Sequence, residues 1–362
     1  MLHLNPNLDQ LPVYQPGRPV EDVARERGFQ LSDVAKLASN ENPLGPSPAA
    51  VEAMRDALEG VHLYPDGNAF YLKRQISESF EMSERQVIVG NGSNELIEFV
   101  AHALLGPGSN IVVSQFCFAI YPIVANMMGA EVITVPALDY GADLDAMAEA
   151  VTDQTRILFL ANPNNPTGTL ADGDSVMDLI RSVDENVLVV IDEAYIEYLE
   201  APQDLLSLVR KGTVPNLLLM RTFSKIHGLA GLRLGYGFGS EALIGALEKI
   251  RQPFNSNLLA QKAATAALKD RTHVASSRRH NRKERLRFEA VCRDRGWEIV
   301  PSFANFVLIR VGDGNGVYEA LLDQGIITRP MAGYQLPEWI RISIGTEAEN
   351  ERCLKALTGV LA

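Results

Sequence analysis

The chain has 362 residues, of which 46% are apolar and 22% charged, and its formal net charge is −12. This length exceeds what a single hydrophobic core usually holds, so two lobes are expected. The acidic balance argues against a protein that binds nucleic acid or membrane surfaces generally. The three cysteines are too scattered for a metal site or a disulfide framework. With no apolar run of membrane-spanning length and no signal-peptide pattern at the start, we expect a cytoplasmic protein.

The first part of the chain shows an arm followed by alternating elements. Residues 1–35 are proline-rich and then mildly helical, and we expect them to join a smaller domain. The expected strands are then VIVG, NIVVS, EVITVP, RILFLAN, VLVVID, NLLLMRT and LGYGFG, and the expected helices include SNELIEFVAHALL, AIYPIVANMMG, LDAMAEAV and DSVMDLIRSV. This alternation predicts a large α/β domain over residues 36–250, with a mostly parallel sheet covered on both faces.

The pattern changes after about residue 240. Long helical stretches near residues 257–295 are followed by the strand patterns NFVLIRV, GIITRP and WIRISIG. This order predicts a smaller α+β domain over residues 251–362.

Several polar residues follow the expected strands of the large domain. Gly90 ends VIVG before the helix start NGSNE, Asn165 lies in NPNNPTG, and Asp192 ends VLVVID with Tyr195 close behind in DEAY. Lys225 follows NLLLMRT between two hydroxyl residues. Taken alone, an aspartate at this place is equally consistent with a structural role, as a helix cap or in an ion pair, and with a role in ligand binding. In parallel sheets, however, ligands bind beyond the carboxyl ends of the strands, where all these residues would meet.

Together these residue types suit pyridoxal 5′-phosphate (PLP). This cofactor needs a lysine amine whose pKa is lowered by burial, and a carboxylate that keeps its ring nitrogen protonated. Asparagine and tyrosine supply donors for its ring oxygen. Backbone N–H groups at a helix start, with hydroxyls and an arginine, form a phosphate cup.

The motifs NPNNPTG, DEAY, RTFSKIHGLAGLRLGYG and IRISIG resemble those of the fold-type I PLP-dependent aminotransferases. The spacings also agree: 27 residues separate Asn165 from Asp192, 33 separate Asp192 from Lys225, and eight separate Lys225 from Arg233. The resemblance covers essentially the whole chain and implies a mostly parallel seven-stranded sheet between helices. The segments ASNENPLGPSP, LYPDG, GNGSNE, SFANFVLIR and GIITRPM narrow it to class II members that resemble histidinol-phosphate aminotransferases of histidine biosynthesis.

The resemblance implies roles around the cofactor ring. Lys225 would bind PLP covalently and move the proton between the substrate and the cofactor. Asp192 would pair with the ring nitrogen, and Tyr195 and Asn165 would bind the ring oxygen. The residues implied for the cofactor phosphate are Ser93, Asn94, Thr222, Ser224 and Arg233.

Two aromatic residues are implied in further cofactor contacts. Phe118, three residues before Tyr121, is the expected stacking partner of the ring, and Phe116 is the alternative. Tyr64 would reach the phosphate in the neighbouring subunit, which implies a homodimer with shared sites.

The substrates implied are histidinol phosphate in one half-reaction and glutamate or 2-oxoglutarate in the other. Arg341 would bind the anionic group of either substrate, because an arginine can fork onto a carboxylate or a phosphate. Arg329 and Tyr14 would bind only the phosphate. The other residues implied at the substrate are Asn42, Asn305 and Phe254, the last where some members have a tyrosine. No metal is expected.

Alternatives stay open at this point. An aromatic amino-acid aminotransferase would share most of these motifs, although Arg329 and Tyr14 argue against it. A PLP-dependent amino-acid phosphate decarboxylase would share them as well. A PLP-binding transcription regulator would need an additional DNA-binding module and fits an acidic chain poorly.

Overall fold

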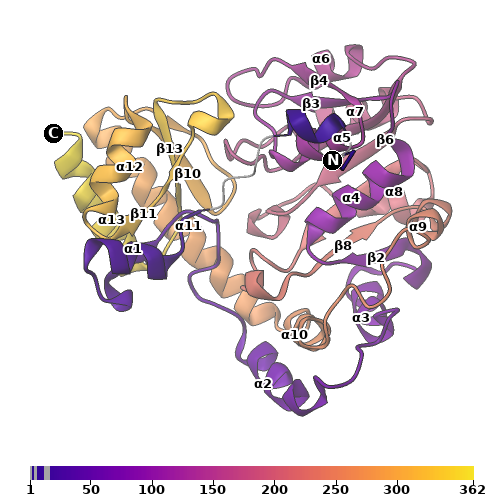
Figure 1. Ribbon diagram of the computed structural model, residues 1–362, viewed down its shortest axis with the longest axis horizontal. Coiled ribbons are helices and arrows are strands. Elements are labelled where there is room, and N and C mark those ends of the chain that lie inside the picture. The colour runs from indigo at the N-terminus through magenta and orange to yellow at the C-terminus, as the bar shows by residue number, and fades with distance from the viewer. Residues whose placement is uncertain (1, 4–5, 12–16) are drawn as a thin grey trace.

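The computed structural model describes residues 2–3, 6–11 and 17–362, which form two lobes (Figure 1). A long helix, α11 (Arg271–Arg295), begins against the larger lobe and ends within the smaller one (Figure 1). Across the described part of the chain, none of the helices has the length and apolar character needed to cross a membrane.

The larger lobe is built on a sheet of seven strands. In spatial order these are β2 (Val87–Gly90), β8 (Gly235–Phe238), β7 (Leu217–Thr222), β6 (Leu188–Asp192), β5 (Thr155–Ala161), β3 (Asn110–Ser114) and β4 (Glu131–Val135). Strand β8 is antiparallel to both of its neighbours, and the other pairings are parallel. The predicted α/β class and the mostly parallel seven-stranded sheet are therefore confirmed.

Helices cover both faces of this sheet (Figure 1). The helices of the larger lobe are α2 (Pro48–Ala57), α3 (Phe70–Phe80), α4 (Ser93–Leu104), α5 (Ile120–Met127), α6 (Leu144–Glu149), α7 (Gly173–Ser182), α8 (Leu206–Lys211), α9 (Glu241–Leu247) and α10 (Leu258–Ala267). Helix α2 packs against α10 rather than directly on the sheet. Alternate residues of β7 point to opposite faces: Leu217 and Leu219 join one core, and Leu218 and Met220 join the other. Both faces bury apolar side chains, which explains why the strand sequences are continuously apolar.

The smaller lobe has a four-stranded antiparallel sheet. Its spatial order is β12 (Arg329–Pro330), β13 (Trp339–Ser343), β10 (Phe306–Arg310) and β9 (Ile299–Val300). Helices α11, α12 (Gly314–Leu322) and α13 (Glu347–Val360) accompany it. A separate parallel pair joins β1 (Ala35–Lys36) to β11 (Ile326–Ile327).

The amino-terminal segment contacts the smaller lobe. In helix α1 (Val20–Arg27), Val23 is fully buried in a cluster with Leu322 and Ile327.

Helix α10 belongs to the core of the large sheet, to which it contributes Ala260, Ala263 and Ala264. The division of the chain at residues 35 and 250 stays a prediction. Short 3₁₀ helices complete the fold: η1 (Pro6–Gln10), η2 (Leu31–Asp33), η3 (Leu58–Gly60), η4 (Glu84–Gln86), η5 (Ile196–Tyr198), η6 (Ala230–Leu232) and η7 (Ala332–Tyr334).

Candidate active site

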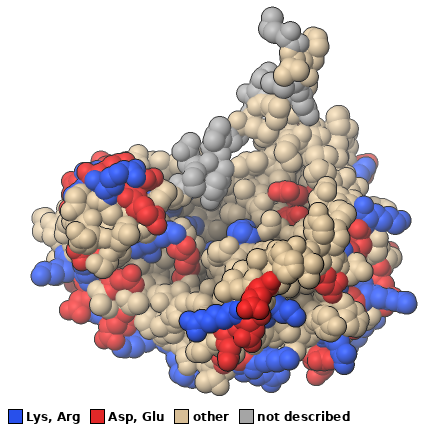
Figure 2. Space-filling view, turned by 60° about the horizontal axis from the view of Figure 1, so that its bottom comes forward, with Lys and Arg blue, Asp and Glu red and all other residues tan. Residues whose placement is uncertain are grey.

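A cavity lies at the carboxyl ends of the parallel strands. Asp192 is the last residue of β6, Thr222 the last of β7, and Ala161 the last of β5. The cavity is lined by Ser93, Asn94, Phe118, Ala161, Pro163, Asn165, Asp192, Ala194, Tyr195, Thr222, Ser224, Lys225 and Arg233. Ten of these thirteen were expected from the sequence to bind the cofactor, so residues spread over 141 positions of the chain meet in one place. Figure 2 shows that the surface is hollowed between the lobes and that basic side chains lie within the hollow.

Lys225 follows β7 and brings its amine into this cavity. Its Nζ atom donates to the carbonyl of Ser39 at 3.2 Å and lies 5.7 Å from the centre of the Tyr195 ring. Burial, reinforced by the charge of Arg341, lowers the pKa of Lys225 to about 8. At about pH 7.5, a pKa of 8 leaves roughly a quarter of the amine neutral, against roughly one part in a thousand for an ordinary lysine. Lys225 is therefore suited to act as a nucleophile and a base.

Asp192 presents a buried carboxylate to the same cavity. Oδ2 accepts a hydrogen bond from the Tyr121 hydroxyl at 2.8 Å, and Oδ1 accepts from the Ala194 N–H at 3.1 Å. Burial nevertheless raises the pKa of Asp192 to about 6, although both hydrogen bonds and Lys225 oppose the shift. A cation bound beside this carboxylate would lower its pKa again.

A second group of side chains joins the smaller lobe to the cavity. Arg341 of β13 is buried, and its guanidinium donates to Oδ1 of Asn165 and, at 3.0 Å, to the carbonyl of Ala38. The Tyr195 hydroxyl accepts from Nδ2 of Asn40 at 2.9 Å. Burial raises the pKa of Tyr195 to about 12, so its hydroxyl keeps its proton near neutral pH.

One end of the cavity is a cradle for an anion. The N–H groups that begin α4 at Ser93 have no partner within the helix and lie at the positive end of its dipole. Arg233 faces them, with Nη1 3.4 Å from Oγ of Ser224. A Cβ atom at Gly92 would lie 2.5 Å from Nη2 of Arg233, and one at Gly235 would lie 2.2 Å from the Ser93 nitrogen. Both positions therefore require glycine for these donors to converge.

The two candidate stacking residues lie in different places. Phe118 lines the cavity, with its ring edge-on to Tyr121. Phe116 belongs to a core cluster that includes Leu308 and Trp339 of the smaller lobe, and its ring stacks with Tyr140. This placement favours Phe118 over Phe116 as the residue available to a ligand.

Two asparagines expected at the substrate make buried hydrogen bonds within the protein. Nδ2 of Asn42 donates to the carbonyl of Ile226 at 2.7 Å and to Oγ of Ser277 at 2.9 Å. Nδ2 of Asn305 donates to the carbonyl of Asn40 at 2.9 Å. Neither asparagine lines the cavity, and their hydrogen bonds anchor the segment around Asn40.

Tyr64, Phe254 and Arg329 do not line this cavity either. Tyr64 is 81% exposed and its ring stacks on Phe254 at 4.7 Å, at the surface beside α2 and α3. Arg329 lines a neighbouring cavity together with Arg18 and Tyr334. Tyr14 lies outside the described residues.

The sequence reasoning missed two residues at this site. Asn40 contacts Tyr195 across 155 positions of the chain, and Tyr121 contacts Asp192 across 71. Tyr121 is fully buried within an apolar helix and has the sequence pattern of an ordinary core aromatic residue. Asn40 adopts a left-handed conformation with a φ of 55°, which asparagine tolerates better than most residues.

Comparisons with known proteins show the family to which the chain belongs. Residues 32–357 match the family described as aminotransferase class I and II. The chain belongs to that family. This aminotransferase is 48% identical to a histidinol-phosphate aminotransferase of Akkermansia muciniphila over 359 residues, which cover 99% of this chain and 98% of the relative. It is also 48% identical to histidinol-phosphate aminotransferase 2 of Pseudomonas aeruginosa over 361 residues, with 99% and 97% covered.

The fold of this aminotransferase is also found among solved structures. The histidinol-phosphate aminotransferase of Sinorhizobium meliloti, solved in complex with pyridoxal 5′-phosphate, superposes with a TM-score of 0.89 at 28% identity. The superposition covers 100% of this chain and 98% of the other.

Proposed function

We propose that the protein is a PLP-dependent histidinol-phosphate aminotransferase. It would interconvert L-histidinol phosphate and 2-oxoglutarate with imidazole-acetol phosphate and L-glutamate, a step of histidine biosynthesis. The observation that carries the proposal is one cavity that combines the Lys225 amine, the Asp192 carboxylate and the anion cradle at Arg233. The identity of nearly half over almost the full length with curated relatives of that name supports the substrate.

The residues present fit PLP in charge and in donor type. The cradle at Ser93, Ser224 and Arg233 offers N–H, hydroxyl and guanidinium donors to a phosphate. The buried carboxylate of Asp192, whose pKa is raised, suits a protonated ring nitrogen. Tyr195 and Asn165 line the same cavity and would bind the ring oxygen, and Phe118 would cover the ring.

The positions of Asp192, Lys225 and Arg341 suggest a separate role for each residue in the reaction. When bound, PLP supplies an electron sink that stabilises negative charge at the substrate Cα. Asp192 preserves that capacity by holding the ring nitrogen protonated. Lys225 would hold the cofactor covalently, and its amine would move the proton between the substrate Cα and the cofactor C4′. Arg341 holds the anionic group of the substrate, which fixes Cα within reach of Lys225.

The two arginines of the smaller sheet have different settings. Arg341 and Arg329 are directly opposite each other across β13 and β12, so their side chains leave the same face of the sheet. Arg341 is bonded to Asn165 of the cavity wall, whereas Arg329 lies beyond, in the neighbouring cavity. We propose that Arg341 serves both substrates and that Arg329 serves only the longer, phosphorylated one.

This proposal predicts unequal effects of two substitutions. Arg341→Ala should slow both half-reactions. Arg329→Ala should slow mainly the half-reaction with histidinol phosphate, by about 1.5–3 kcal/mol for a lost charged hydrogen bond. Single-turnover rates with histidinol phosphate and with glutamate measure the two halves separately. Arg310→Ala is a control in the same antiparallel sheet, because Arg310 pairs with Glu298 and Glu338 on the exposed side. Equal losses with both substrates in Arg329→Ala would contradict the proposal.

A homodimer is the assembly we propose. Between residues 58 and 71 the chain exposes Leu58, Val61, Leu63, Tyr64, Phe70 and Tyr71, each by 47% or more. Such a concentration of apolar side chains is typical of a surface that another protein covers. Tyr64 does not reach the cavity of its own chain, which agrees with a role in the neighbouring subunit's site, and Phe254 would accompany it.

The shared site predicts complementation between two inactive subunits. Mixed dimers of Lys225→Ala and Tyr64→Ala chains should regain activity at one site, where the wild-type Lys225 of one subunit meets the wild-type Tyr64 of the other. The measurement is activity after subunit exchange, with exchange itself followed by differently tagged chains. Exchanged dimers without recovered activity, or an active monomer in sedimentation, would contradict the shared site.

Product analysis tests the proposed reaction. Purified protein with PLP should form imidazole-acetol phosphate and glutamate only when histidinol phosphate and 2-oxoglutarate are both present. Phenylalanine in place of histidinol phosphate tests an aromatic aminotransferase, and released carbon dioxide from a phosphorylated amino acid tests a decarboxylase. We also propose a cytoplasmic location, where this biosynthetic reaction would find its substrates.

A further inference from the structure

Tyr195 is linked to the smaller lobe by two buried side chains. Nδ2 of Asn40 donates to the Tyr195 hydroxyl at 2.9 Å, and the Ser343 hydroxyl donates to Oδ1 of Asn40 at 3.0 Å. The backbone N–H of Asn40 donates in turn to Oγ of Ser343 at 2.8 Å. All three residues are at most 3% exposed. We call the chain of hydrogen bonds from Ser343 through Asn40 to Tyr195 the relay. Water is largely excluded from it, and each of its protons has few possible acceptors.

The relay determines which way the Tyr195 proton points. The Ser343 oxygen accepts from the Asn40 N–H, so its single proton is left for Oδ1 of Asn40. That assignment turns the Asn40 amide nitrogen toward Tyr195, whose oxygen must then accept. Among the residues that the structure describes, none accepts a hydrogen bond from the Tyr195 hydroxyl, which lines the cavity. Its proton is thus available to a ligand in the cavity.

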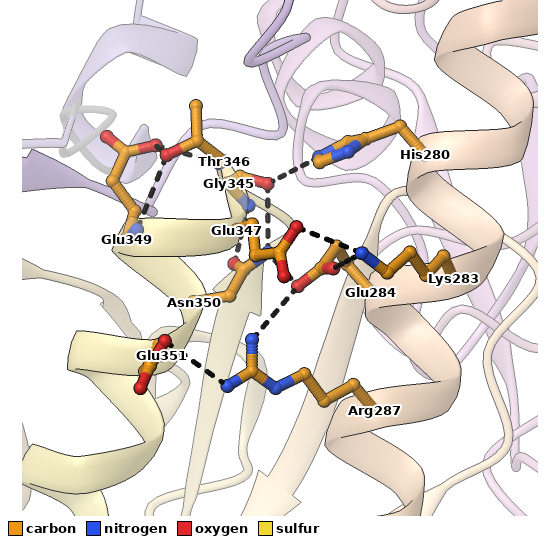
Figure 3. A network of polar contacts seen from close by, with 10 residues as sticks. All are labelled: His280, Lys283, Glu284, Arg287, Gly345, Thr346, Glu347, Glu349, Asn350 and Glu351. Carbon is orange, nitrogen blue, oxygen red and sulfur yellow. Dashed lines mark hydrogen bonds and ion pairs between the residues drawn. The ribbon is translucent and has the colours of Figure 1, made fainter.

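The far end of the relay is held rigidly. Ser343 ends β13, and the turn after it is fixed by the network in Figure 3. The Gly345 carbonyl accepts from Nε2 of His280 at 2.8 Å and from Nδ2 of Asn350 at 2.9 Å, and Asn350 also bonds the fully buried Glu284. Helices α11 and α13 therefore fix the strand end from which Ser343 reaches Asn40.

We propose that Asn40, held by Ser343, is a positioning residue that orients the Tyr195 hydroxyl as a donor toward the cofactor's ring oxygen. This inference rests on the proposed PLP chemistry and adds a residue that acts through Tyr195 rather than on the ligand. Because Ser343 and Arg341 belong to the same strand, the hydroxyl at the cofactor and the arginine at the substrate share one support.

Two substitutions of Asn40 test the inference. Asn40→Asp keeps the shape and suits the positive φ, but it places an acceptor beside Tyr195 that takes the proton away from the cavity. Asn40→Gly removes the side chain without opposing the backbone conformation. Tyr195→Phe, alone and combined with Asn40→Asp, is the reference. Ser277→Ala is the control, because it disturbs the anchoring of the same segment through Asn42 without contacting Tyr195.

The readouts are PLP affinity and the pH midpoint at which the visible absorbance of the bound cofactor changes. When the ring oxygen loses a hydrogen-bond donor, its negative charge favours the protonated form of the neighbouring nitrogen that would join Lys225 to the cofactor. The midpoint should therefore rise by about one to two pH units in Asn40→Asp, as in Tyr195→Phe. Asn40→Gly should shift it in the same direction by less. The double variant should resemble Tyr195→Phe alone, and Ser277→Ala should titrate like the wild type.

The outcomes distinguish a failure of the Asn40 inference from a failure of the proposed function. An Asn40→Asp midpoint that matches the wild type, or that shifts equally when Tyr195 is already phenylalanine, would overturn this inference and leave the proposed function intact. A wild-type protein that gains no visible absorbance with PLP would overturn the proposed function, and this inference with it.

Discussion

Lys225→Ala is expected to fold normally and to lose transamination. Its amine is the one that the cavity places near both Asp192 and Tyr195, and its pKa of about 8 makes it reactive near neutral pH. Removing a positioned proton-transfer group costs roughly a hundredfold to ten-thousandfold in rate, and here the covalent anchor of the cofactor is lost too. The measurement is the steady-state rate with both substrates, alongside circular dichroism and thermal unfolding to verify the fold.

A control substitution at another lysine and borohydride reduction of the bound cofactor provide two further tests of the role of Lys225. Lys73→Ala removes another largely buried lysine, one that pairs with Glu248 outside the cavity, and it should retain activity. Borohydride reduction of the wild type with PLP should attach the cofactor to the peptide that contains Lys225. A Lys225→Ala protein that turns over near the wild-type rate, or a label on another lysine, would contradict the assignment.

Asp192→Asn is expected to bind PLP and to react at least a hundredfold more slowly. Asparagine keeps the shape and can still bond Tyr121 and Ala194, but it carries no charge to hold the ring nitrogen protonated. A loss smaller than about tenfold in kcat, or roughly 1.4 kcal/mol of barrier, would contradict the assigned role.

Tyr121→Phe separates the charge of Asp192 from its support. It removes the hydroxyl that donates to Asp192 Oδ2 but leaves the carboxylate in place. Because the charge remains, this variant should be slowed far less than Asp192→Asn. Equal losses in the two variants would mean that the orientation of Asp192, rather than its charge, determines the rate.

Local sequence patterns predicted the sheet well and the surface helices less well. NIVVS coincides with β3, because a strand buried on both faces leaves a continuous apolar run. Helices α2 and α3 were not predicted. In α2 only Ala50 is buried, and in α3 the buried residues are Leu72, Ile76 and Ser77, so each helix buries few apolar side chains.

The helical region near residues 257–295 divides into α10 and α11. Asp270 begins the second helix, because its side chain accepts from the His273 N–H. This cap is a local signal that the sequence already contains.

The site was predictable where a residue belongs to a motif at a strand end. Asp192, Lys225 and Arg233 stand in such motifs, and they meet because parallel strands end at one edge of the sheet. Asn40, Ser343 and Tyr121 could not be assigned in this way. Their contacts with the cavity residues depend on how the two lobes and α5 pack, and no local pattern encodes that packing.

The central claim is that histidinol phosphate is the amino donor. The half-reaction with an amino donor alone, in the absence of 2-oxoglutarate, tests this claim most directly. The protein loaded with PLP is mixed rapidly with histidinol phosphate, phenylalanine or aspartate, and the visible absorbance of the bound cofactor is followed over a single turnover. The account predicts that histidinol phosphate changes this absorbance much faster than the other two donors. Phenylalanine reacting as fast as histidinol phosphate would contradict it and would favour an aromatic amino-acid aminotransferase.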